Sequence, residues 1–143
     1  MNNSSKPPVW FWVVSALALL WNLAGVANYL AQAYATPEML AAMPEHQREY
    51  MEQTPSWVIG CFAIAVWAGS IGSILLLIRK KIAYMVLILS LIGVLGQVSY
   101  SLIFSNAIEV YGPSGVILPI FIVGIGVYLV YFAKKSTANG WLS

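Results

Sequence analysis

Four long runs without a charged residue constrain this chain more than any other feature. In the 143-residue sequence they hold 31, 26, 27 and 24 residues and cover positions 7–37, 53–78, 82–108 and 110–133. An α-helix needs about 20 apolar residues to cross the hydrocarbon core of a bilayer. We therefore expect four membrane-spanning helices, with no length left for a separate soluble domain.

The amino-acid composition argues against a soluble fold. Hydrophobic residues make up 60% of the chain and charged residues only 8%, with a mean hydropathy of +0.79. Soluble domains usually contain about 25% charged residues. The expected fold is an all-α membrane protein, an antiparallel bundle of four transmembrane helices in a single membrane domain, residues 1–143. The expected spans are about 9–34, 56–78, 82–105 and 115–133.

The basic residues predict how the bundle is oriented. In a four-span arrangement one side carries Lys6, Arg79, Lys80, Lys81, Lys134 and Lys135. The other side carries Arg48 and every acid, namely Glu38, Glu45, Glu49, Glu52 and Glu109. Because lysine and arginine are enriched in cytoplasmic loops, both termini and the 79–81 turn are expected in the cytoplasm.

Residues 1–33 allow one alternative to a first membrane span, namely a cleaved signal peptide. Its apolar run is too long for a signal peptide and is interrupted by Asn22 and Asn28, so a retained span is favoured. The formal charge of +2 does not indicate nucleic-acid binding, because the basic residues flank membrane spans. The expected partner is the lipid bilayer.

Residues 36–54 form a polar loop with helix-start signals. Thr36-Pro37-Glu38 combines a capping hydroxyl, a proline at the first helical position and an acid near the positive end of the helix dipole. Pro44-Glu45 repeats the last two elements, and Thr54-Pro55 has the same cap and proline before the second span. We expect one or two short amphipathic helices that cover the outer end of the bundle.

Polar residues recur on one face of two spans. The first span carries Ala18, Asn22, Gly25, Tyr29 and Gln32 at helical spacing, and the third carries Gln97, Tyr100 and Ser101. These groups gather in the outer half of the bundle, which predicts an outward-opening cavity for a small neutral solute. The candidate substrate-binding residues are Trp21, Asn22, Tyr29, Gln32, Gln97, Tyr100, Asn106 and Glu109. The alternative is that these groups bond one another, at about 0.6 kcal/mol each, and hold the helices together.

Enzyme signatures are lacking. The sequence has no aspartate, one histidine (His46), one cysteine (Cys61), no glycine-rich phosphate loop and no nucleophile elbow. We therefore expect neither catalysis, nor a metal, nor a cofactor. Glu109 is the one acid close to the end of a span, and no carboxylate lies deep in the membrane. That argues against the mechanism of small multidrug exporters, which resemble this chain in size but rely on a buried glutamate.

Small residues repeat every four positions in the second span, at Cys61, Ala65, Gly69 and Ser73. Such a stripe lets two helix backbones approach closely in lipid. The sequence leaves open whether the stripe packs within the bundle or forms a homodimer with a second copy of the chain. With a single cysteine, no intramolecular disulfide can form.

Four segments resemble a family of small bacterial inner-membrane proteins with four spans, whose members often carry the label "sugar transporter". The segments are WNLAGVANYLAQAYATPEMLAAMPE, LIRKKIAYMVLILSL, SNAIEVYGPSG and FAKKSTANGWLS. The resemblance covers nearly the whole chain and implies a bacterial inner-membrane location and transport of a small solute such as a sugar. No catalytic role attaches to these motifs. The alternative function is a non-transporting scaffold or accessory subunit.

Overall fold

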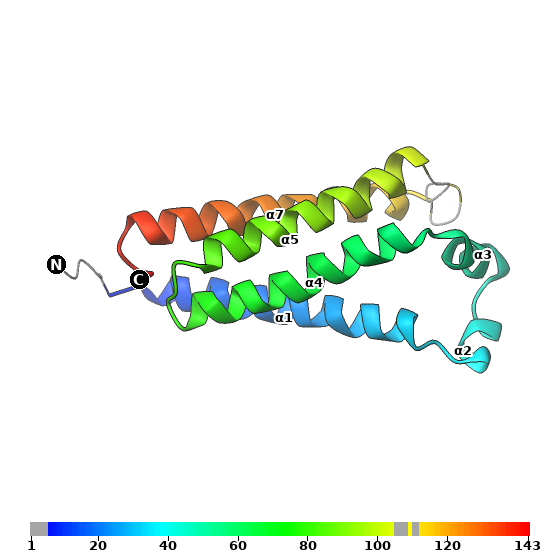
Figure 1. Ribbon diagram of the computed structural model, residues 1–143, viewed down its shortest axis with the longest axis horizontal. Coiled ribbons are helices and arrows are strands. Elements are labelled where there is room, and N and C mark those ends of the chain that lie inside the picture. Colours follow the sequence, from blue (N-terminus) through cyan, green and yellow to red (C-terminus); the bar gives the residue numbers. More distant parts are fainter. Residues whose placement is uncertain (1–5, 105–108, 110–111) are drawn as a thin grey trace.

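The computed structural model describes residues 6–104, 109 and 112–143, and within these ranges the chain forms helices and no strand. The long helices are α1 (Val9–Ala33), α4 (Ser56–Leu77), α5 (Ala83–Ser99) and α7 (Ser114–Ala138). Consecutive long helices run in opposite directions (Figure 1). Among the described residues, the four segments long and apolar enough to cross a membrane are Val9–Ala33, Ser56–Leu77, Ala83–Ile103 and Val116–Ala138. The protein is a multi-pass membrane protein, and the predicted all-α four-helix bundle is confirmed.

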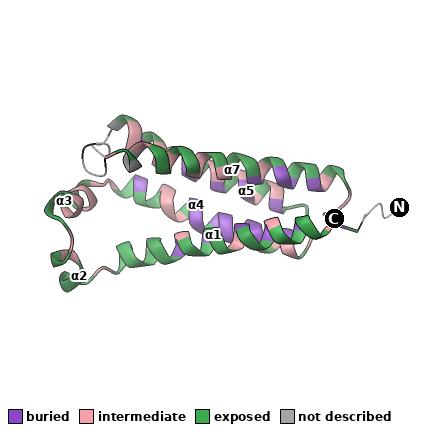
Figure 2. Ribbon diagram, turned by 180° about the vertical axis from the view of Figure 1, so that it is seen from behind, coloured by how far each residue is buried: buried purple, intermediate pink, exposed green. Residues whose placement is uncertain are grey.

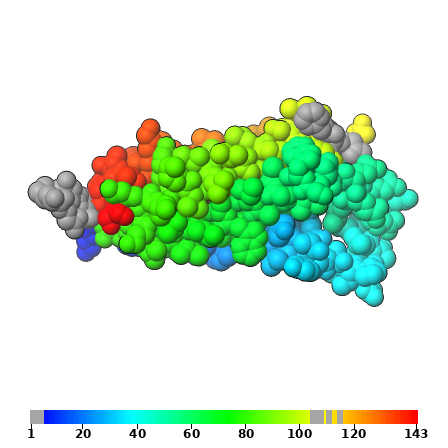
Figure 3. Space-filling view, viewed as in Figure 1, coloured from blue at the N-terminus to red at the C-terminus, as the bar shows by residue number. Residues whose placement is uncertain are grey.

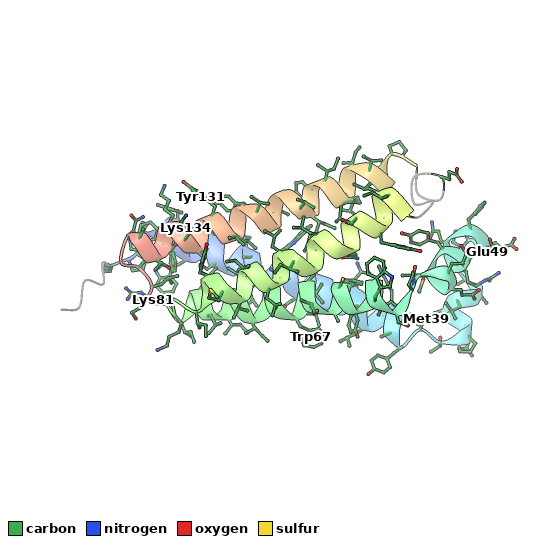
Figure 4. All side chains as sticks on the ribbon, turned by 45° about the horizontal axis from the view of Figure 1, so that its top comes forward. Met39, Glu49, Trp67, Lys81, Tyr131 and Lys134 are labelled. Atoms are coloured by element: carbon green, nitrogen blue, oxygen red, sulfur yellow. The ribbon has the colours of Figure 1, made fainter. Side chains whose placement is uncertain are left out.

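The two ends of the bundle differ in character. One end, called the basic end below, carries the α4–α5 turn and the C-terminal tail (Figure 1). Lys81 and Lys134 lie at this end, whereas Met39 and Glu49 lie at the opposite one (Figure 4). The opposite end is covered by α2 (Pro37–Ala41) and α3 (Glu45–Gln53), together called the cap.

The cap begins as its sequence predicts. Thr36 is the N-cap of α2, and its hydroxyl accepts a hydrogen bond from the Met39 amide at 3.2 Å. Arg48 on α3 donates to the Leu40 carbonyl at 3.4 Å, which joins the two short helices. The expected hydroxyl cap of α4 is wrong, because Thr54 donates instead to the Tyr50 carbonyl at 2.8 Å. Thr54 therefore closes α3 rather than starting α4.

Small residues bring α4 close to its neighbours. α1 packs against α4, α4 against α5, and α5 against α7. Ser90 on α5 donates to the Ala65 carbonyl on α4 at 2.6 Å, and Gly69 packs against both Asn22 and Ser90. The small-residue stripe of α4 therefore lies inside the bundle, so a homodimer would have to form through another face. The homodimer itself stays a prediction.

Aromatic rings and the C-terminal tail close the basic end. Phe11 is fully buried and stacks on Phe132, with ring centroids 5.6 Å apart. The Arg79 Nε donates to the Trp141 carbonyl at 2.8 Å, and the Ser143 amide donates to the Arg79 carbonyl at 2.9 Å. Leu142, between these bonded residues, is 2% exposed. The tail is thus tied to the α4–α5 turn and packed into the core at this end.

Two span ends differ from the expected bounds. α7 continues to Ala138, beyond the expected end at about 133, and stops where Gly140 adopts a positive φ of 76°. A glycine with positive φ just after the last turn is a common helix terminator. The third span is not one regular helix, because α5 ends at Ser99 and a π-helix, η1 (Tyr100–Phe104), follows it. π-helical turns are rare and occur often at functional sites.

Candidate functional site

A cavity of about 320 Å³ lies at the cap end of the bundle. All four long helices, α3 and η1 contribute to it, and it is called the cap-end cavity below. Its lining residues are Tyr29, Gln32, Ala33, Tyr50, Met51, Thr54, Val58, Ile59, Phe62, Gln97, Ser101, Leu118, Pro119 and Ile122. In the space-filling view the surface is hollowed between the blue outer end of α1 and the cyan segments of the cap (Figure 3).

Three of the predicted site residues line this cavity: Tyr29, Gln32 and Gln97. Tyr29 and Gln32 are three positions apart on α1 and therefore share a face. The Tyr29 ring packs in a T-shaped contact with the Phe62 ring of α4, with centroids 5.6 Å apart. Gln97 reaches the same cavity from α5. Amide groups from two helices that are not neighbours in the bundle thus face one space.

Asn22 and Trp21 lie deeper and do not line the cap-end cavity. Asn22 is 8% exposed, and its Nδ2 donates to the Ala18 carbonyl at 2.8 Å and to the Ser73 hydroxyl at 3.5 Å. Both Asn22 and Trp21 border a separate void of only about 30 Å³. The Trp21 ring packs edge-on against Phe121, 5.8 Å between centroids. Asn22 therefore joins α1 to α4, which is the role that the alternative interpretation gave to the polar stripe.

The polar stripe of α1 thus divides into two parts with different surroundings. Around Asn22, α1 packs tightly on α4, and a Cβ added at Gly25 would meet Val66 at 2.7 Å. Beyond Val26 the remaining residues of α1 are exposed or half-buried. The stripe follows one face of α1. Near Asn22 this face packs on α4, whereas near Tyr29 and Gln32 it borders the cap-end cavity. Asn28, beside the stripe, is exposed and does not line the cavity.

The remaining predicted residues are placed as follows. Tyr100 is 9% exposed and lies outside the lining, where its ring packs against Tyr50 at 6.4 Å and Trp57 at 6.0 Å. This contact holds α3 against the end of the bundle, so Tyr100 supports the cavity wall. Glu109 is exposed and does not line the cavity. Asn106 lies outside the described residues.

The sequence did not identify several lining residues. Ser101 is on the polar face already predicted for the third span, although it is not among the candidate binding residues above. Tyr50 and Thr54 come from the cap, whose distance from the spans cannot be judged from spacing alone. Leu118, Pro119 and Ile122 come from α7 and carry no polar side chain, so no sequence signal marks them.

Among the residues that the structure describes, the cavity lining combines hydrogen-bonding groups with apolar surface and contains no Lys, Arg, His, Asp or Glu. Amides and hydroxyls can donate and accept hydrogen bonds with an uncharged ligand. A buried ionic ligand would need an opposite charge to offset its desolvation, and the lining does not supply one. In the described part of the chain, no three His, Cys, Asp or Glu residues come together as a metal site.

Known proteins offer no further identification. The chain matches no protein-family model, no curated protein and no solved structure. The resemblance to the four-span bacterial family therefore stays a prediction.

Proposed function

We propose that this membrane protein binds a small uncharged solute in the cap-end cavity and carries it across the bacterial inner membrane. The observation that supports the proposal is the lining itself, whose described residues offer amides, hydroxyls and aromatic faces but no charged side chain. A volume of about 320 Å³ is near the lower end of the range for small-molecule sites. The lining and the volume together suit a compact hydroxylated solute such as a sugar.

The charge distribution supports an orientation for this proposal. Arg79, Lys80, Lys81, Lys134 and Lys135 lie at the basic end of the described chain. The positive-inside bias then favours the basic end, with both termini, in the cytoplasm. In that orientation the cap-end cavity faces the outside. The resemblance to small bacterial four-span proteins labelled as sugar transporters favours the same membrane and solute class.

A second candidate function is a non-transporting scaffold or accessory subunit. The buried Asn22, hydrogen-bonded to Ala18 and Ser73, favours it, because here a polar group of the stripe holds helices together. The two candidates differ at the cap-end cavity. A binding protein needs Gln97 for its ligand, whereas a scaffold tolerates its loss.

The Gln97→Leu variant tests this difference. We expect uncharged solutes to bind it about three- to tenfold more weakly than the wild type, because one hydrogen bond to an uncharged group contributes about 0.5–1.5 kcal/mol. The measurement is equilibrium binding to protein in proteoliposomes. The panel contains polyols, monosaccharides and the corresponding sugar acids, and we expect the acids not to bind.

Asn28→Leu is the matched control, since it also replaces an amide by leucine but at an exposed position outside the lining. We expect its affinity to equal that of the wild type. If Gln97→Leu binds as tightly as the wild type, the assignment of this cavity as the site is wrong. If the wild type binds no member of the panel, the accessory role is the better account.

A further inference from the structure

The bundle is less tightly closed between α1 and α7 than between its other neighbouring helices. α1 packs on α4 and α7 packs on α5, whereas backbone contact between α1 and α7 is sparse. Seen from behind, these two helices diverge toward the cap end (Figure 2). The boundary between α1 and α7 is called the seam below.

Aromatic rings fill the seam from the basic end to about its middle. Phe11 of α1 stacks on Phe132 of α7 at 5.6 Å, and Trp21 meets Phe121 edge-on at 5.8 Å. Within the described residues, no ring pair joins the two helices further toward the cap. In that region both helices contribute residues to the cap-end cavity.

From the exposed lining residues on α1 and α7, we infer that the cavity reaches the surface along this part of the seam. Gln32 and Ala33 border it from α1, and Leu118 and Ile122 border it from α7. Leu118 lines the cavity and is also 52% exposed, so it stands at the edge of an opening. Leu118 and Ile122 belong to the segment Val116–Ala138, which is long and apolar enough to cross a membrane, so we infer that this edge of the cavity faces acyl chains.

We propose that the cap-end cavity takes an uncharged single-chain amphiphile that enters from the bilayer through the seam. This inference rests on the proposed function, because it names the ligand class of the same site. The Gln97 amide and the groups from the cap provide hydrogen bonds for a hydroxylated head, while Ile59, Phe62 and Ile122 provide apolar contact for its chain.

The charge of the lining decides between classes of lipid. A phosphate head is best bound by Arg or Lys through charge-assisted hydrogen bonds. In the described part of the chain no Arg or Lys lines the cavity, and Arg48 of the cap donates from its guanidinium to the Leu40 carbonyl. The expected ligand is therefore chemically similar to a monoacylglycerol, with hydroxyls on a small head and one chain.

Photolabelling tests the proposal with the full chain in proteoliposomes. The probe is a monoacylglycerol with a diazirine in its acyl chain, and mass spectrometry locates the adducts. We expect saturable adducts on cavity residues such as Leu118 and Ile122. An excess of unlabelled monoacylglycerol should remove them, whereas the same chain carrying a phosphate head should not.

Two tryptophan substitutions on α7 provide the second readout. Ile122→Trp fills the cavity beside the seam, and we expect about tenfold fewer saturable adducts. Ile120→Trp is the control, because Ile120 is 58% exposed and does not line the cavity. Its labelling should equal that of the wild type. Monodisperse gel filtration and helical circular dichroism show whether both variants are folded.

Unsaturable labelling, spread evenly over the lipid-facing residues of wild type and variants, would overturn the inference. Failure of the proposed function gives a different pattern. If water-soluble polyols bind but no labelling is saturable, the amphiphile proposal is wrong and the proposed solute site stands. If labelling is saturable in the wild type and lost in Ile122→Trp, while no water-soluble solute binds, the amphiphile is supported. The proposal of a water-soluble substrate is then wrong.

Discussion

We expect Gly93→Ala to lower the free energy of unfolding by about 2–3 kcal/mol, the upper part of the usual cost of overpacking. A Cβ at Gly93 would lie 2.7 Å from the Cys61 carbonyl oxygen and 2.8 Å from the Ala65 amide nitrogen. Both are backbone atoms of α4, so no side-chain rotation can relieve the overlap. The helices must separate, which also strains the Ser90 to Ala65 hydrogen bond.

Gly124→Ala is the matched control for this prediction. A Cβ at Gly124 would meet no described atom within 4 Å, so we expect no loss and a gain of up to about 1 kcal/mol from helix propensity. Reversible unfolding of both variants in mixed micelles, followed by circular dichroism, gives the comparison. Equal stability of the two variants would mean that α4 and α5 do not approach as closely as described.

The second large effect is expected for Phe11→Ala, which should lower the free energy of unfolding by about 2 kcal/mol. Phe11 is fully buried and contacts the rings of Phe132 and Trp141. In water a buried Phe→Ala change costs about 3–5 kcal/mol, partly for transfer to an apolar medium. Unfolded spans stay among apolar chains, so most of the transfer contribution is lost and the cost of the empty volume remains.

Leu17→Ala provides the comparison for Phe11→Ala on the same helix. Leu17 is 59% exposed, so its truncation leaves no internal void, and we expect a change below about 0.5 kcal/mol. The same micelle unfolding assay applies to both. A Phe11→Ala variant as stable as Leu17→Ala would show that the aromatic cluster at the basic end contributes little to the fold.

The spans and the cap follow from local sequence signals. Runs without charge set the number of spans, and the hydroxyl, proline and acid at Thr36-Pro37-Glu38 set the start of α2. Local signals do not give every cap. Thr54 has the same hydroxyl-proline pattern, but Pro55 is the N-cap of α4, without a side-chain cap bond, and the Thr54 hydroxyl donates back to the Tyr50 carbonyl of α3.

The candidate site could be predicted only in part. Helical spacing shows which residues share a face, and in this way it found Tyr29, Gln32 and Gln97. It cannot show where two helices separate along their length. Asn22 is on the same face as Tyr29, yet Gly69 of α4 lets the helices meet there, and the amide is buried between them.

The two ends of the bundle differ in how open they are, which matters for the proposed transport. At the cap end the cavity reaches the surface, whereas at the basic end Phe11 and the tail close the bundle. Under the proposed function, a solute bound in the cap-end cavity would pass the basic end only after these contacts separate.

The most direct test of the account is cysteine accessibility at the cap-end cavity. In a Cys61→Ala background, Gln97→Cys and Ser90→Cys place single thiols on α5, in the lining and in the packed α4–α5 contact respectively. A charged, membrane-impermeant maleimide is added outside spheroplasts. We predict rapid labelling of Gln97→Cys and labelling of Ser90→Cys only after denaturation. Equal protection of both thiols, or labelling of Gln97→Cys only from the cytoplasmic side, would contradict an outward-opening cavity.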